Sequence, residues 1–120
     1  MPTHHLSSAR TLSSQAASLR DALRRGLEDP GEVYALVTEL RAVAAYLQEA
    51  VRQVQSWAQM PDDEWAAICD GEDAGDRPAR SELVNGLSDA AIGLGVAEMS
   101  LERAQQGARR LRTIRLGGGA

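Results

Sequence analysis

The apolar positions between residues 33 and 57 repeat at alternating spacings of three and four, which is the pattern of one face of a helix. These positions are Val33, Leu36, Leu40, Val43, Leu47, Ala50, Val54 and Trp57. A second apolar row lies next to it round the cylinder, at Val37, Ala44, Val51 and Ala58. A stripe of this width can pack against two neighbours, so we expect this long helix to have at least two partners.

A capping signal marks the start of this helix. Asp29 supplies a side-chain acceptor for free backbone N–H groups, Pro30 suits the first helical position, and Glu32 can complete a capping box with the N–H of Asp29. At the other end, Pro61 removes a backbone donor and ends the helix. The pattern therefore predicts a helix over 30–60.

Three further helices are predicted from their own apolar rows and breaks, over 8–27, 62–69 and 80–115. The apolar row of the first is Ala9, Leu12, Ala16, Leu19 and Leu23, and that of the last is Leu83, Leu87, Ala90, Leu94, Ala97, Leu101, Ala104, Ala108 and Leu111. The low aromatic content of 3% also favours helices over a sheet. We therefore expect an all-α fold, an elongated antiparallel bundle of three main helices plus one short helix.

The remaining segments are predicted to connect or flank these helices. Residues 70–78 are rich in acidic residues and glycine and are predicted to form a loop. Residues 1–7 and 117–120 are expected to be flexible tails. A chain of 120 residues is long enough for one core, so the prediction is a single domain over 8–116.

The last predicted helix carries small residues at a fixed spacing. Gly86, Gly93, Ser100 and Gly107 recur every seven residues. A glycine inside a helix costs about 1 kcal/mol relative to alanine, so we expect the close approach of another helix to compensate for this stripe. A helix that is broken around Gly93 and Gly95 is the alternative.

A second apolar stripe, formed by Ile92, Val96 and Met99, lies on the face opposite the row that begins at Leu83. A helix with two apolar faces either lies in the centre of its bundle or presents one face to a partner. We therefore expect a non-enzymatic interaction or adaptor protein that forms a homodimer or binds another helical protein. The predicted interface consists of Ile92, Val96, Met99, Gly86, Gly93 and Gly107.

The net charge of −4 argues against a protein that mainly coats nucleic acid or an anionic membrane. The charge is unevenly distributed, because residues 61–82 hold eight acidic side chains whereas the end of the last helix is basic. The basic residues there are Arg103, Arg109, Arg110, Arg112 and Arg115. They complement the helix macrodipole and could meet the acids of residues 62–76. They also support an alternative function, a DNA-binding accessory or regulatory protein that contacts phosphates.

The sequence shows no arrangement that predicts catalysis, a cofactor or a metal site. Cys69 is the single cysteine and has no histidine near it in the sequence, which excludes an intrachain disulfide and argues against a nucleophile. The acidic stretch that begins at Asp70 lacks the glutamate that a calcium loop needs at its twelfth position, where Ser81 stands. His4 and His5 lack the spacing of a metal site. The first residues lack the pattern of a secretory signal and no apolar stretch approaches membrane-spanning length, so we expect a cytoplasmic protein without a membrane partner.

Two resemblances are carried by particular segments. Residues 32–40, 47–57 and 104–106 are similar to segments of small uncharacterised helical proteins of actinobacteria, which tend to be encoded on integrative, plasmid-like elements. This resemblance implies no activity and no site residues. In size the chain also resembles the small secreted helical-hairpin proteins of type VII systems. Those proteins carry Trp-x-Gly at the hairpin turn, whereas here the sequence after Trp57 is Ala-Gln and that after Trp65 is Ala-Ala.

Overall fold

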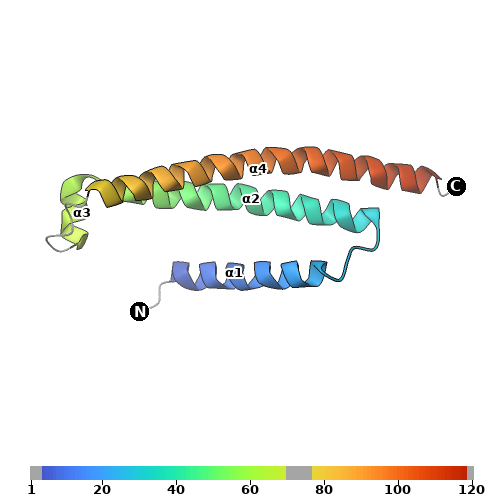
Figure 1. Ribbon diagram of the computed structural model, residues 1–120, viewed down its shortest axis with the longest axis horizontal. Helices are drawn as coiled ribbons and strands as arrows, with labels where there is room; N and C mark the ends of the chain where they lie inside the picture. The colour runs from blue at the N-terminus through green and yellow to red at the C-terminus, as the bar shows by residue number, and fades with distance from the viewer. Residues whose placement is uncertain (1–3, 70–76, 119–120) are drawn as a thin grey trace.

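The computed structural model describes residues 4–69 and 77–118, and side chains within 4–67 and 77–112. In this part of the chain four α-helices follow one another: α1 (His4–Leu23), α2 (Pro30–Ala58), α3 (Asp62–Cys69) and α4 (Arg77–Gly118) (Figure 1). The molecule is elongated, with principal extents of 71 × 27 × 19 Å. The predicted all-α, elongated architecture is therefore confirmed, and α3 has the predicted bounds.

The start of α2 follows from its local sequence. The Oδ1 atom of Asp29 accepts the backbone N–H of Glu32 at 3.0 Å, and Pro30 occupies the first turn. The carboxylate of Glu32 accepts the backbone N–H of Glu28 at 3.2 Å. The predicted capping box used the N–H of Asp29, so the return bond comes from one residue earlier than expected. The first bond satisfies an orphan donor at the helix start, and the second joins the residue before the cap to the first turn.

The bounds of the outer helices differ from the predictions. Helix α1 begins at His4, inside the predicted tail, and ends at Leu23 rather than at residue 27. The backbone N–H of Gly26 donates to the carbonyl of Leu23 at 3.0 Å, and Gly26 has a φ of +91°. This left-handed conformation takes the chain out of the helix, and glycine adopts it without steric cost.

Helix α4 is longer than predicted and unbroken. It begins at Arg77, because Pro78 is tolerated in a first helical turn, and it continues to Gly118, within the predicted tail. It passes through Gly93 and Gly95 without interruption, so the alternative of a broken helix is wrong. Most of the predicted loop, residues 70–76, lies outside the described residues.

Helices α2 and α4 form an antiparallel hairpin, and among the described residues they are the only closely packed pair of helices (Figure 1). The buried side chains of the described residues are all alanines: Ala44 and Ala58 on α2, and Ala91 and Ala108 on α4. Alanine lets two helix backbones approach closely but removes little apolar surface from water. The hairpin therefore has a thin core.

Polar side chains share the contact between the two helices. The Nη1 atom of Arg41 donates to Oε1 of Gln105 at 2.8 Å, and the Nε2 atom of Gln48 donates to the carbonyl of Ala91 at 2.9 Å. The amide of Gln105 also donates to the hydroxyl of Thr38 at 3.0 Å. These bonds join residues that are 43 to 67 positions apart in the sequence. Polar groups within a helix pair fix its register, because any shift leaves them unpaired.

The row of α2 that faces α4 is the second apolar row. Ala44 and Ala58 belong to it, and Arg41 and Gln48 precede and follow Ala44 at the spacing of a helix seam. On α4 the facing positions are half-buried or buried, and they are Val84, Leu87, Ala91, Leu94, Glu98, Leu101, Gln105 and Ala108. The first apolar row of α2, from Val33 to Trp57, is rotated from this contact by one residue, which is about 100°. It is directed to the side of the hairpin.

Helix α1 lies alongside α2, which separates it from α4 in the view of Figure 1. It contains no buried side chain, and Leu6 and Leu12 are 45% and 40% exposed. The expected third main helix is thus present, but it contributes no close-packed interface with the hairpin.

Candidate interaction surfaces

One side of the hairpin is lined by apolar and small residues from both long helices, and we call it the hairpin face. Its residues are Val33, Leu36, Leu40, Val43, Leu47, Ala50, Val54 and Trp57 of α2, with Leu83, Gly86, Ala90, Gly93, Ala97, Ser100, Ala104, Gly107 and Leu111 of α4. Each of these residues precedes by one a residue of the α2–α4 contact. In an antiparallel pair of helices, the residues that come one position before the contact residues lie on the same side of the pair in both helices.

The hairpin face carries no charged residue. Val33, Leu36, Leu40 and Leu47 are half-buried, whereas the other residues of its α2 row are exposed. Val54 and Trp57 are each 50% exposed, and Leu83 and Leu111 are 40% and 60% exposed. A Cβ atom placed on Gly93 would have no atom within 4 Å beyond its own helix, and the same holds for Gly86 and Gly107. Helix α1 therefore does not cover the glycine stripe. Within residues 4–69 and 77–118, no other helix lies close to these glycines, so the expected compensation by a neighbouring helix is not seen there.

The predicted interface residues divide between two sides of α4. The three glycines lie on the hairpin face, whereas Ile92 and Met99 lie on the opposite flank of α4, with Val96 on its outer surface between them. All three apolar residues are exposed, at 59%, 68% and 57% respectively. Val96 and Met99 border a shallow hollow whose other lining residues are Ser100, Glu102, Arg103 and Gln106. We call Ile92, Val96 and Met99 the outer α4 patch; unlike the hairpin face, it is bordered by charged residues.

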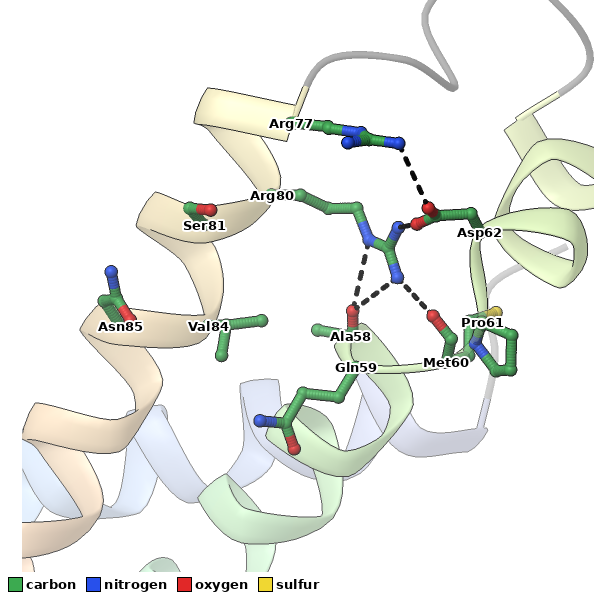
Figure 2. Close-up of a pocket in the computed structure, with 10 residues that line it drawn as sticks. All are labelled: Ala58, Gln59, Met60, Pro61, Asp62, Arg77, Arg80, Ser81, Val84 and Asn85. Carbon is green, nitrogen blue, oxygen red and sulfur yellow. Dashed lines mark hydrogen bonds and ion pairs between the residues drawn. The ribbon is translucent and has the colours of Figure 1, made fainter.

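The end of the hairpin is closed by Arg80, whose side chain is only 14% exposed (Figure 2). Its guanidinium group donates to the carbonyl of Ala58 at 3.4 Å, to the carbonyl of Met60, and to Oδ1 of Asp62 at 2.6 Å. It also lies over the ring of Trp65, 4.7 Å from the centroid. Arg80 thus binds carbonyls at the end of α2, which carry the negative end of the helix dipole, and joins them to the start of α3.

Neighbouring groups complete this hairpin end. Trp65 packs edge-to-face on Trp57, with ring centroids 4.9 Å apart. Arg77 forms an exposed ion pair with Asp62 at 3.5 Å. Asp62, Arg77 and Arg80 border a hollow of about 660 Å³ (Figure 2), and their charged groups are engaged in joining α2, α3 and α4. We therefore assign this end a structural role.

Sequence reasoning missed this cluster, because it paired the acidic segment with the arginines at the end of α4. Asp62 instead pairs with Arg77 and Arg80, at the start of that helix. A signal was present: a cation in the first turn of a helix is disfavoured by the macrodipole. Two arginines there indicate that they bind something other than their own helix.

The arginines of the predicted nucleic-acid contact do not gather on one surface. Arg112 lies over the ring of Tyr34, 4.1 Å from its centroid, within the α2–α4 contact. Arg103 and Arg110, seven residues apart, share the outer surface of α4, and Arg103 donates to the Ser100 hydroxyl at 3.5 Å. Arg109 lies on the flank of α4 that faces away from the hairpin face, and the side chain of Arg115 is outside the described residues.

The part of the chain that the structure describes carries neither a metal-binding cluster nor a membrane-spanning helix. There, no three His, Cys, Asp or Glu side chains are grouped so that they could hold a metal ion. No helix in the same residues combines the length and apolar character needed to cross a membrane. Comparisons of the chain with protein-family models, with curated proteins and with solved structures found no match.

Proposed function

We propose that this protein is a non-enzymatic helical interaction protein that associates with a second copy of itself. The observation that carries the proposal is the hairpin face: the longest apolar row of α2 is turned away from α4, while the α2–α4 contact fully buries only alanines and also contains polar side chains. An apolar surface with several exposed large side chains is typical of an interaction site.

The size of the effect can be judged from the exposed side chains. Full burial of a large apolar side chain is worth roughly 1.5–3 kcal/mol, and Val54, Trp57 and Leu111 keep half or more of their surface in water. Two copies that cover Val43, Val54, Trp57, Leu83 and Leu111 on each other would gain on the order of 10 kcal/mol by this measure. Association itself costs an estimated 4–15 kcal/mol, so the equilibrium should depend visibly on protein concentration.

The test is the mass in solution, measured by sedimentation or by light scattering on a sizing column over a wide range of concentrations. The expected result is a rise from 12.9 kDa towards twice that value as concentration increases, with little effect of salt because the hairpin face is uncharged. A mass of one chain at every concentration would refute self-association.

Two matched variants locate the contact. Val43→Glu with Val54→Glu places two charges on the hairpin face, and Ile92→Glu with Val96→Glu places two on the outer α4 patch. All four positions are exposed in the monomer, so circular dichroism should show unchanged helicity for both. We expect the first variant to abolish association and the second to leave it intact. The opposite result would identify the outer α4 patch as the interface.

A further inference from the structure

The two halves of the hairpin face differ in side-chain size. Helix α2 supplies large residues such as Leu40, Leu47 and Trp57, whereas the middle of α4 supplies only alanine, glycine and serine. We infer that two copies of this chain meet face to face with α2 of each copy lying along α4 of the other, about a two-fold axis parallel to the hairpin. This inference rests on the proposed self-association.

Size complementarity favours this arrangement over the other two-fold dimer. An axis perpendicular to the hairpin would place α2 on α2 and α4 on α4, so that large residues would meet large ones and the glycine stripe would face a second glycine stripe. Cores are well packed when large residues oppose small ones. When α2 of one copy lies along α4 of the other, its side chains fill the open space at Gly86, Gly93 and Gly107.

Charge at the edges points to the same arrangement. Within one chain, Arg41 contacts Gln105 and Tyr34 contacts Arg112, which places Glu39 level with Gly107. A two-fold axis along the hairpin preserves these levels. Glu39 lies on the outer surface of α2, and Arg103 and Arg110 lie on the outer surface of α4, so in one chain they face in opposite directions. In the inferred dimer, Glu39 of one copy lies beside Arg103 and Arg110 of the other.

Helix α1 is too short to occupy the hairpin face in place of a second copy. Its 20 residues span about 30 Å at 1.5 Å per residue, whereas α4 extends about 42 Å from Leu83 to Leu111. The linker joins α1 to the hairpin at the Leu111 end, where Leu27 borders a hollow with Val33 and Leu111. A folded-back α1 would therefore leave Trp57 and Leu83 exposed at the far end.

Cysteine cross-linking tests the arrangement on the 120-residue chain in a Cys69→Ser background. Val43 is level with Ala104, so the variant with Val43→Cys and Ala104→Cys should form disulfide-linked dimers on mild oxidation, visible on a non-reducing gel. The control pair, Leu40→Cys with Ala50→Cys, lies on α2 alone and should link far less, because the two α2 helices are diagonal to each other. Each single variant serves as a further control.

The outcomes separate the inference from the proposed function. Efficient linkage of the 43 and 104 pair supports the inferred dimer. A dimer by sedimentation that fails to link through this pair overturns the arrangement but leaves self-association standing. A monomer at all concentrations removes both.

A charge swap gives a second, independent readout. Glu39→Arg should weaken dimerisation about threefold, as should Arg103→Glu combined with Arg110→Glu, since rim ion pairs contribute little individually. The chain that carries all three changes should recover the original dissociation constant at low salt. Additive weakening in the combined variant would show that these residues do not meet, and would overturn the arrangement.

Discussion

Gly93 lies on the hairpin face, so its replacement by alanine should have opposite effects on the single chain and on the proposed dimer. In a helix interior, alanine is favoured over glycine by about 0.8–1.0 kcal/mol. A Cβ atom at Gly93 would meet no atom within 4 Å beyond its own helix. The full propensity gain should therefore be realised in the monomer, as an increase of about 1 kcal/mol in the free energy of unfolding.

Gly95, two residues further along the same helix, is the matched control. A Cβ atom there would lie 2.6 Å from Nε2 of Gln48, which donates to the carbonyl of Ala91 at 2.9 Å. The added methyl group must displace this amide, and the loss of a hydrogen bond costs about 0.5–1.5 kcal/mol. The gain and the loss are of similar size, so Gly95→Ala should leave the stability near that of the original chain.

The assay is urea unfolding followed by circular dichroism at a concentration where sedimentation shows a single chain, repeated where it shows a dimer. In the dilute sample Gly93→Ala should exceed Gly95→Ala in stability by about 1 kcal/mol, a difference of roughly 4 °C in Tm for a domain of this size. In the concentrated sample Gly93→Ala should weaken association, because the methyl group occupies the space of the partner helix. A dilute Gly93→Ala chain that is less stable than the original would refute the open-face reasoning.

Three further predictions follow from particular contacts. Arg80→Lys should lower the free energy of unfolding by about 2 kcal/mol in urea titrations, because an ammonium group cannot reach two carbonyls and a carboxylate in the guanidinium geometry. Arg77→Lys, at an exposed ion pair, should change the free energy of unfolding little. Equal losses in the two variants would contradict the structural role assigned to Arg80. Asp29→Ala should cost about 1 kcal/mol by the same measurement, since it removes the acceptor for the Glu32 N–H, while Glu28→Ala should be close to neutral. Duplex DNA should not bind even near 50 mM salt in a gel-shift titration, because the chain is acidic and Arg112 is held on Tyr34. DNA binding that is lost on replacing Arg103 and Arg110 would instead support the DNA-binding alternative.

The sequence was sufficient where the determining signal was local. The start of α2 was predicted because Asp29 and Pro30 act on the backbone within one turn. The end of α1 was missed, because the apolar row continues to Leu27 and only the conformation of Gly26 interrupts it. Periodicity predicts a helix face, but it does not show where a glycine will leave the helical conformation.

The sequence also indicated that α2 has two apolar rows but could not assign their partners. Both rows have the same helical spacing, so periodicity alone does not rank them. The choice is made by contacts such as Gln48 with Ala91 and Arg41 with Gln105, between residues far apart in the chain. The Arg80 cluster was missed for a related reason, because its acceptors include the main-chain carbonyls of Ala58 and Met60, which have no side-chain signature.

The α2–α4 contact and the hairpin face have different physical roles. The contact contains polar groups such as Gln48 and Gln105, which stabilise one register of the two helices but bury little apolar surface. The hairpin face has the opposite character: it is apolar and specifies no polar pairing, and it includes exposed side chains such as Val54, Trp57 and Leu111. A helix pair with a thin alanine core gains stability when that surface is covered. The hairpin therefore has a register fixed by polar contacts and a small core, and in the proposed dimer a second hairpin with the same face enlarges that core.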